Sequence, residues 1–306
     1  MDLTSPVQKI EHPIFTKHQL TVFIKRDDLI HPIISGNKWR KLKHNIKFAN
    51  ENGYQGILSF GGAYSNHVHA LAYAGFQQNF KTKAIIRGEH FYVDNCTLSQ
   101  AKAWGMQFNF VDRKTYRLRD NVNYLKGLKI RYPNYFIVPE GGSNALALDG
   151  MAEVIHELNQ QINYDTLLTP IGSAGTLAGL IRADMNQHEI IGIAVLKHAE
   201  YLHSRIKELL DSTTPILDKW KILDNFHRGG YGKFSQDDEQ RLYQFNQQTG
   251  IIFEPIYSGK MLLAFLDLVQ QGHFKKNTTV ALLHTGGLQG INGLIEQKKL
   301  PASRWR

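Results

Sequence analysis

Cysteine is nearly absent from this chain, since Cys96 is the only one among 306 residues. One cysteine can form neither an intramolecular disulfide nor a cysteine-based metal cluster. That composition fits a reducing compartment. The N-terminus lacks the basic segment and apolar run of a signal peptide, and no stretch approaches the ~18 apolar residues of a membrane helix. We therefore expect a cytoplasmic protein that does not enter a membrane.

The chain also lacks an extreme composition. Hydrophobic residues make up 42% and charged residues 21%, which is typical of a globular protein large enough for one big domain or two. The formal net charge of +9 requires nucleic-acid binding to be considered, but acidic residues are interleaved with the basic ones and no recognised nucleic-acid motif occurs. We expect no nucleic-acid partner and attribute the excess charge to solubility or to anionic small molecules.

Apolar segments alternate with helical patterns along the chain. The predicted strands cover residues 20–24, 56–60, 83–87, 107–111, 135–138, 165–171, 190–196 and 279–284. The predicted helices cover residues 38–52, 68–74, 98–104, 116–126, 148–161, 177–185, 200–210, 237–249 and 261–270. Residues 1–20 and 211–236 are predicted to be irregular. Because most strands are continuous apolar runs, the pattern favours an α/β fold with open, mostly parallel sheets and helices on both faces.

Four predicted strands end in glycine-rich turns that start helices, at residues 61–67, 140–144, 172–176 and 285–287. Ligands of open α/β sheets bind outside the carboxyl ends of strands, and backbone N–H groups at helix starts hold anions. The turn Gly172-Ser173-Ala174-Gly175-Thr176 has the small residues and hydroxyls of a phosphate site. It lacks the ending of a P-loop, the Rossmann spacing and the Gly-x-Ser-x-Gly of serine hydrolases. A tight connection without a ligand is the alternative for each turn.

A cluster of cations opens the helix predicted after Gly36, where Lys38, Arg40 and Lys41 lie within four residues. Cations at a helix start oppose the helix dipole, so the cluster is either a solvated basic face or a lysine that works beside a bound anion. His67 and His69 do not indicate a metal site, because helix neighbours two residues apart point to different sides. A lysine, several anion-binding turns and no metal cluster suit a phosphate-bearing aldehyde cofactor held as a Schiff base.

Several motifs together resemble a known family, the 1-aminocyclopropane-1-carboxylate deaminases and D-cysteine desulfhydrases, which use pyridoxal 5'-phosphate and have the tryptophan-synthase β-like fold, called fold type II. The resemblance extends from about Lys25 to Gly290. The motifs are Lys25-Arg26-Asp27-Asp28, Gly36-Asn37-Lys38-x-Arg40-Lys41-Leu42, Gly61-Gly62-x-x-Ser65-Asn66-His67, Gly172-Ser173-x-Gly175-Thr176, Pro255-x-Tyr257-x-Gly259-Lys260 and His284-Thr285-Gly286-Gly287.

The resemblance implies a role for each matching residue. Lys38 would bind the cofactor covalently and move the Cα proton, and Lys41 and residues 172–176 would bind its phosphate. Asn66 would reach the 3-hydroxyl of the pyridine ring and Thr285 the ring nitrogen. The substrate would be bound by Ser65, Asn66 and His67, with Ser65 assisting catalysis. Tyr231 and Tyr257 match the two active-site tyrosines of the family.

One departure from the family pattern bears on the reaction. The cyclopropane deaminases carry a glutamate directly after the second tyrosine, where this chain has Ser258. A hydroxyl does not keep the ring nitrogen protonated as a carboxylate does, which favours β-elimination over opening of a cyclopropane ring. We therefore expect D-cysteine desulfhydrase-like chemistry that yields pyruvate, ammonia and sulfide. The alternatives are 1-aminocyclopropane-1-carboxylate deaminase activity, which yields 2-oxobutanoate and ammonia, and a non-catalytic basic binding protein of the same fold.

The resemblance also implies an arrangement of domains. A small domain at residues 46–146 would be inserted into a large one made of residues 1–45 and 147–306, with the cofactor between them.

A second departure from the family pattern is Arg228-Gly229-Gly230, where the family has a longer aromatic-rich stretch before the tyrosine. The family further implies a homodimer, a small amino-acid substrate and a lyase or hydrolase classification.

Overall fold

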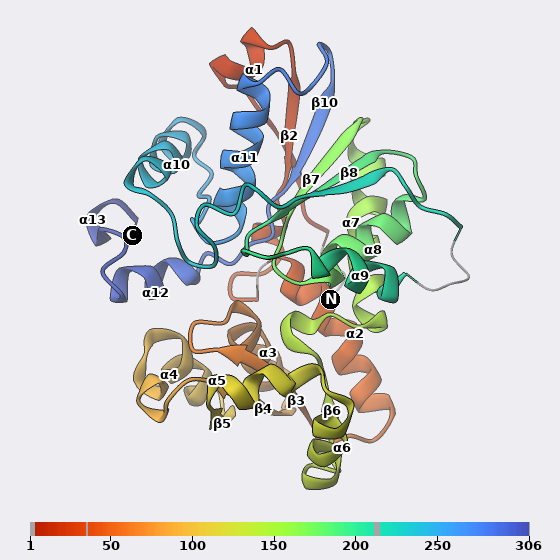
Figure 1. Ribbon diagram of the computed structural model, residues 1–306, viewed down its shortest axis with the longest axis vertical. Helices are drawn as coiled ribbons and strands as arrows, with labels where there is room; N and C mark the ends of the chain where they lie inside the picture. The colour runs from red at the N-terminus through yellow and green to blue at the C-terminus, as the bar shows by residue number, and fades with distance from the viewer. Residues whose placement is uncertain (1–3, 35, 211–214, 306) are drawn as a thin grey trace. The chain divides into compact units, whose positions relative to one another are not determined.

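The computed structural model describes residues 4–34, 36–210 and 215–305, which form two compact units (Figure 1). The first unit consists of Met1–Asn37 and Met151–Leu288, and the second of Lys38–Gly150 and Gln289–Arg306. Two of the three unit boundaries fall inside helices, α2 (Asn37–Glu51) and α7 (Ala145–Gln161), and the third lies between Leu288 and Gln289. The expected small domain at 46–146 stays a prediction; the compact unit containing it is longer at both ends and also includes Gln289–Arg306.

The first unit is built on a six-stranded sheet in the order β1-β2-β10-β7-β8-β9. Its strands are β1 (Val7–Ile10), β2 (Thr21–Lys25), β7 (Thr166–Ile171), β8 (Glu189–Ala194), β9 (Trp220–Leu223) and β10 (Thr279–Leu283). Only the β1–β2 pairing is antiparallel among the described strands of this sheet. All six residues of β7 are buried, as expected for a central parallel strand that is covered on both faces.

Helices cover this sheet. They are α1 (Pro13–Lys17), α8 (Ala174–Asp184), α9 (Tyr201–Leu209), α10 (Gln236–Thr249) and α11 (Ser258–Gln270), with the short 3-10 helix η1 (Asp27–Leu29) after β2. Helices α8 and α11 both pack against β7 and β8. Eleven of the thirteen residues of α11 are buried, so this helix is a core element rather than a surface one.

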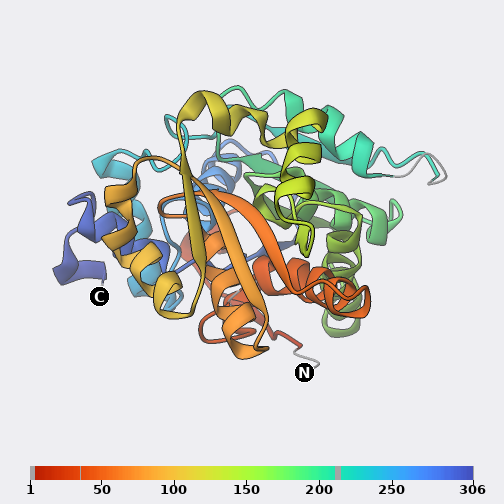
Figure 2. The same cartoon turned by 90° about the horizontal axis from the view of Figure 1, so that it is seen from below.

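The second unit has its own four-stranded parallel sheet in the order β5-β4-β3-β6, followed most easily in orange and yellow in Figures 1 and 2. Its strands are β3 (Gly56–Gly62), β4 (Lys81–Arg87), β5 (Gln107–Val111) and β6 (Tyr135–Ile137). Its helices are α3 (Asn66–Gln77), α4 (Cys96–Ala103), α5 (Arg113–Tyr116), α6 (Val122–Arg131), α12 (Gly290–Glu296) and α13 (Ala302–Trp305), with 3-10 helices η2 (His90–Asp94), η3 (Arg117–Asp120) and η4 (Glu140–Gly142). Its core includes Leu58, Phe60, Ile85, Tyr116 and Leu128.

The predicted architecture of open, mostly parallel sheets with helices is confirmed, whereas three local predictions are wrong. Residues 7–10 form β1 and residues 220–223 form β9 within stretches predicted to be irregular. The helix predicted at 116–126 is interrupted because the Asn121 side chain accepts the N–H groups of Asn123 (3.0 Å) and Tyr124 (3.1 Å) and so starts α6. Helix α2 is confirmed, since it begins at Asn37, within one residue of its predicted start.

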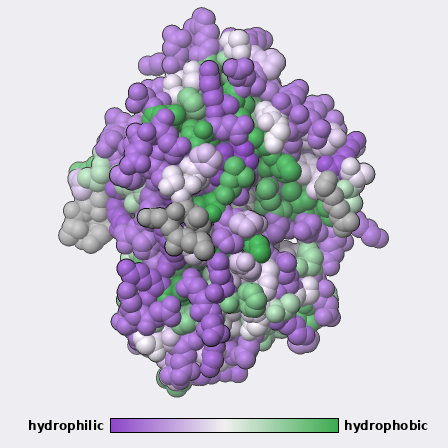
Figure 3. Space-filling model, turned by 180° about the vertical axis from the view of Figure 1, so that it is seen from behind, coloured by the Kyte–Doolittle hydropathy of each residue, from purple (hydrophilic) through white to green (hydrophobic). Residues whose placement is uncertain are grey.

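The surface is mostly polar on the face drawn in Figure 3, where hydrophobic residues gather in patches between hydrophilic ones. Among the described residues, no helix combines the length and the hydropathy required to cross a bilayer. This agrees with the absence of long apolar runs from the sequence.

Candidate active site

In the first unit, the carboxyl ends of β10 and β7 lie next to each other because these strands are parallel neighbours. Thr285 follows β10 and Gly172 follows β7. Gly36 lies against the first of these turns, since a Cβ atom on Gly36 would be 1.8 Å from the Thr285 carbonyl oxygen. Gly36 also has a φ of +68°, so this approach requires glycine.

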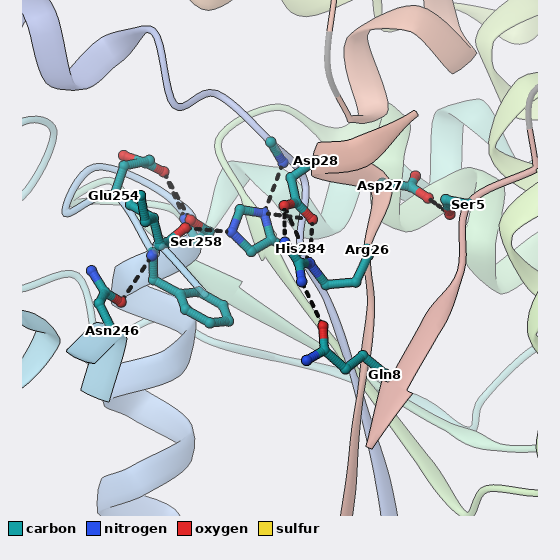
Figure 4. A network of polar contacts seen from close by, with 12 residues as sticks. Ser5, Gln8, Arg26, Asp27, Asp28, Asn246, Glu254, Ser258 and His284 are labelled. Atoms are coloured by element: carbon teal, nitrogen blue, oxygen red, sulfur yellow. Dashed lines mark hydrogen bonds and ion pairs between the residues drawn. The ribbon is translucent and has the colours of Figure 1, made fainter. Parts of the chain in front are cut away.

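His284 supports the turn that carries Thr285. Its Nε2 donates to the Ile252 carbonyl oxygen at 2.8 Å, and its Nδ1 accepts the Gly286 N–H at 3.2 Å. Burial lowers the pKa of the imidazole, opposed by the Asp28 carboxylate 3.7 Å away. Figure 4 shows His284 beside Asp28 in this buried network. His284 therefore holds the backbone of the turn as a neutral ring, the structural role that its place at a strand end allows.

Asn37 joins the start of α2 to the turn after β7. Its Nδ2 donates to Thr176 Oγ1 at 2.8 Å, and both residues are buried. Lys38 is the next residue in the chain and is half-buried. The bond therefore joins the residue that precedes Lys38 to the turn at residues 172–176 within the first unit.

The turn Gly172–Thr176 leads into α8, whose N-cap residue is Ser173. The Ser173 side chain makes no capping hydrogen bond to the helix backbone. A helix start of this kind presents backbone N–H groups and a positive dipole end to an anion. The first unit thus has a suitable cradle at the position predicted for the cofactor phosphate.

The two predicted tyrosines meet beside this turn. The rings of Tyr231 and Tyr257 are 5.9 Å apart at 69°, an edge-to-face arrangement. A Cβ atom on Gly172 would be 2.9 Å from Cε1 of Tyr257, so the Tyr257 ring lies against the start of the turn. Tyr231 is 43% exposed, which leaves its ring accessible to a small ligand.

In the second unit, Ser65 and Asn66 start α3. Ser65 is the N-cap, and its Oγ accepts the Val68 N–H at 3.3 Å. Asn66 Oδ1 accepts from Gln289 Nε2 at 2.6 Å, which turns the amide so that Nδ2 can donate elsewhere. The start of a twelve-residue helix suits a carboxylate.

Lys41 and His67 are buried in the second unit with polar atoms that have no hydrogen-bond partner among the described residues: Nζ of Lys41 and Nδ1 of His67. Burial, and then the charge of Lys38, lowers the pKa of Lys41 well below its usual range. Burial, and then Lys41 and Lys38, does the same to His67. A buried ammonium without an acceptor is costly, and an anion at Nζ would remove that cost.

The two histidines of α3 are hydrogen-bonded residues. His67 Nε2 donates to Ser59 Oγ at 2.7 Å, because that hydroxyl donates to the Val138 carbonyl oxygen at 2.8 Å. His69 Nε2 bonds Gln100 Oε1 at 2.8 Å. Within the described parts of the chain, no group of three or more His, Cys, Asp or Glu side chains could hold a metal ion.

The structure brings the predicted site residues together in two sets. In the first unit, Gly172–Thr176, Tyr231, Tyr257 and Thr285 surround the carboxyl ends of neighbouring strands. In the second, Ser65, Asn66 and His67 occupy the start of α3. Lys41 lies near His67, since a Cβ atom on Gly142 would contact both, at 3.6 Å from Lys41 Cβ and 3.3 Å from His67 Cε1. Ser258, the departure from the family pattern, is buried and bonds Glu254.

Sequence reasoning missed the residues that orient this set. Gln289 turns Asn66, Ser59 holds His67, and Glu254 binds the start of α11. None of the three belongs to the motifs given above, and each acts on a residue distant in sequence or through backbone groups. Only the spacing of Glu254, which lies just before Pro255-x-Tyr257, offered a signal.

These residues fit pyridoxal 5'-phosphate. The buried Nζ of Lys41 lacks an acceptor among the described residues, and the helix start at Ser173 is of the kind that binds a phosphate. Lys38 would supply the amine, and Thr285 and Asn66 carry polar side chains of the kind that the ring requires. Nothing in either set of residues conflicts with that cofactor.

Comparisons with known proteins agree with this chemistry. Residues 5–286 match the family described as pyridoxal-phosphate dependent enzyme. A D-cysteine desulfhydrase of Klebsiella pneumoniae is 28% identical over 288 residues, covering 88% of each chain. The mitochondrial bifunctional D-cysteine desulfhydrase/1-aminocyclopropane-1-carboxylate deaminase of Arabidopsis thaliana is 24% identical over 307 residues, covering 93% of this chain and 76% of that one. The crystal structure of an ACC deaminase homologue superposes with a TM-score of 0.82 at 25% identity, covering 96% of this chain and 92% of that one.

Proposed function

Because this chain belongs to the family of pyridoxal-phosphate dependent enzymes, we propose that it is a lyase that removes ammonia and a β-substituent from a small amino acid, as a D-cysteine desulfhydrase does. The products from D-cysteine would be pyruvate, ammonia and sulfide. Family membership argues against the alternative of a non-catalytic basic binding protein. The observation that carries the proposal is the buried Nζ of Lys41, three residues after Lys38 on α2, which has no hydrogen-bond partner in the part of the chain that the structure describes.

The cofactor supplies an electron sink for negative charge that develops at the substrate Cα. Lys38 would hold it and would remove the Cα proton of the substrate. Lys41 and the N–H groups of residues 172–176 would bind its phosphate. Asn66, turned by Gln289, and Thr285 would hold the ring by its polar atoms. These assignments rest on matching motifs and on the local geometry of each residue.

The substrate carboxylate would bind at the start of α3. Ser65 Oγ and the nearby backbone N–H groups provide donors there, and the positive end of the helix favours a negative charge. His67 would contribute its Nδ1, the atom left without a partner among the described residues. Because burial lowers the pKa of His67, the ring would stay neutral, and Nδ1 would accept a hydrogen bond from the substrate.

Tyr231 and Tyr257 would act on the leaving group and the substrate amine. Their edge-to-face contact fixes the ring planes, and the exposure of Tyr231 allows a ligand to reach it. Ser258 supports β-elimination over ring opening, because this position of the chain carries a hydroxyl where the cyclopropane deaminases carry a carboxylate. Opening of a cyclopropane ring, the second candidate reaction, needs a stronger electron sink than expulsion of sulfide.

The setting of the enzyme is part of the proposal. We place it in the cytoplasm because of its single cysteine and as a homodimer by analogy with the family. A small amino acid is its substrate, and nucleic acid is not a partner. A hydrolase classification would apply if the overall reaction is written with the water that releases ammonia.

A substrate panel tests the proposed reaction. Enzyme loaded with pyridoxal 5'-phosphate is supplied with D-cysteine, L-cysteine, D-serine or 1-aminocyclopropane-1-carboxylate, and 2-oxo acid and sulfide are measured. We expect the highest kcat/KM with D-cysteine, with pyruvate and sulfide in equal amounts. Faster formation of 2-oxobutanoate from the cyclopropane would favour the deaminase alternative, and a loaded enzyme inactive on the whole panel would overturn the proposal.

A further inference from the structure

Two fully buried residues of opposite charge bracket Tyr257, namely Glu254 and Lys260. The Glu254 carboxylate accepts the backbone N–H groups of Ile256 (2.6 Å), Tyr257 (2.9 Å) and Ser258 (2.8 Å). Figure 4 shows Glu254 and Ser258 together. Lys260 Nζ donates to the carbonyl oxygens of Val195 (3.3 Å), His227 (2.9 Å) and Gly230 (2.5 Å). One residue therefore gathers three backbone donors and the other gathers three backbone acceptors.

Each of the two charges holds the segment that carries one tyrosine. Tyr257 has φ −125° and ψ −76° at the N-cap of α11 and has no side-chain cap bond of its own, and Glu254 binds its N–H. Tyr231 directly follows Gly230, whose φ is +103° and whose carbonyl oxygen bonds Lys260. The two anchored segments bring the rings together edge to face at 5.9 Å.

Stability alone does not account for such a pair. Desolvating two charges usually outweighs their attraction, and apolar residues of similar size are often as stable or more so. Here each charge is instead matched to three backbone dipoles, which lie in the loop at residues 227–230 and after β8 for Lys260, and at the start of α11 for Glu254. The two buried charges therefore cost folding stability but hold the backbone at residues 227–231 and 256–258 in fixed positions.

We propose that Glu254 and Lys260 are positioning residues that together set the relative orientation of Tyr257 and Tyr231. The inference rests on the proposed function, which assigns both tyrosines to catalysis. Lys260 fixes Tyr231 by binding the loop at His227 and Gly230 to the end of β8. Glu254 fixes Tyr257 by binding the first turn of α11. Loss of either charge is expected to displace mainly its own tyrosine.

The charge state of the pair changes near neutral pH. Burial raises the pKa of Glu254 to about 7, although the backbone and Ser258 hydrogen bonds oppose this. Burial lowers the pKa of Lys260 to about 8; Glu254 and Asp238 oppose this shift and Arg228 adds to it. Phe253, the residue before Glu254, contacts the buried ring of His284, and the Asp28 carboxylate lies 3.7 Å from that ring. Turnover is expected to be highest between the two pKa values, where the tyrosines are held by both charges.

The test compares Lys260→Met and Glu254→Gln with two controls in the loaded enzyme. The controls, Lys221→Met and Glu189→Gln, remove charges of the same two kinds in the same unit, where Lys221 and Glu189 form a half-exposed ion pair 2.7 Å long. Hydrogen exchange is followed at the amides of Gly229, Gly230 and Lys233, which bond the loop internally. Fluorotyrosine NMR reports on the rings of Tyr231 and Tyr257, assigned with the two Tyr→Phe variants.

We expect Lys260→Met to speed exchange in the loop about tenfold or more and to shift the Tyr231 resonance. Glu254→Gln should shift the Tyr257 resonance. Both should lower kcat more than they change KM and should alter the pH profile, and the controls should do neither. Lys260→Arg should recover part of the loop protection, and it replaces Lys260→Met if that variant does not fold.

Two outcomes would overturn the inference. Unchanged exchange and resonances in Lys260→Met and Glu254→Gln would remove the positioning role itself. Shifted resonances with unchanged kcat would show that the orientation of the tyrosines does not matter to the reaction. An enzyme that turns over no substrate would overturn the proposed function instead, because exchange and resonances are measured without turnover.

Discussion

Asn37 Nδ2 donates a 2.8 Å hydrogen bond to Thr176 Oγ1 and so ties the start of α2 to the turn that follows β7. Both side chains are buried. Because Lys38 is the neighbour of Asn37 and Thr176 ends the predicted phosphate turn, the bond is expected to order two parts of the cofactor site at once.

Removing this bond should weaken cofactor binding. Thr176→Val leaves the Asn37 amide without that acceptor, which costs about 1–3 kcal/mol when the group stays buried. We expect the Kd for pyridoxal 5'-phosphate to rise about tenfold or more, measured by titrating the apoprotein. Thr176→Ser, which retains the hydroxyl, should remain near wild type. Equal affinity in both variants would show that this hydrogen bond does not contribute to cofactor binding.

Gly36→Ala should be strongly destabilising. Its φ of +68° alone costs a non-glycine residue about 1–3 kcal/mol. The added Cβ would also lie 1.8 Å from the Thr285 carbonyl oxygen, so backbone must move. Gly53→Ala is the control, because its φ is +73° but its Cβ would meet nothing within 4 Å. Denaturant unfolding should show a clearly larger loss for position 36, and equal losses would contradict the close contact.

Lys41→Met should separate stability from ligand binding. The variant removes a buried charge without a hydrogen-bond partner among the described residues, so the apoprotein should be as stable as wild type or about 1 kcal/mol more stable. Its affinity for pyridoxal 5'-phosphate should fall about tenfold to a hundredfold, as expected for the loss of a charged phosphate contact. Lys47→Met, on the exposed side of the same helix, should change neither. Unaltered affinity in Lys41→Met would exclude the phosphate role.

Glu254 should make the protein less stable as the pH rises toward neutrality. Its pKa is raised from 4.5 to about 7 in the folded protein, so the folded state holds the proton more tightly than the unfolded one. This contribution is fully present below pH 4.5 and is lost as pH rises through 7. It amounts to at most about 3 kcal/mol. Urea unfolding is measured at pH 5 and pH 7.5. The free energy of unfolding should fall less for Glu254→Gln than for wild type over this interval. An identical fall would show that another group causes the pH dependence.

The fold could be predicted where burial dictates the sequence pattern. The central strands β3, β7 and β8 are buried on both faces and therefore consist mostly of apolar residues and glycine, with few polar side chains. The edge strands could not be predicted in this way. Only Ile10 of the four residues of β1 is buried, and all four residues of β9 are half-buried. Short edge strands are stabilised by pairing to a neighbour, which leaves little trace in their own sequence.

Some residues of the candidate site could be predicted from the sequence and others could not. Glycines that permit close approach, such as Gly36 and Gly172, are visible in the sequence because no other residue fits. Glu254, Gln289 and Ser59 act through hydrogen bonds to other side chains or to backbone groups. Such side chains carry no periodicity or motif, and only the folded chain shows their partners.

Lys38 is the residue proposed to hold the cofactor, and the proposed reaction depends on it most. The direct measurement is borohydride treatment of the enzyme loaded with pyridoxal 5'-phosphate, followed by peptide mass spectrometry to locate the reduced pyridoxyl group. We predict that the visible absorbance disappears, that the label is found on Lys38, and that Lys38→Ala takes up no label. A label on another lysine, or a protein that never becomes coloured, would contradict the account.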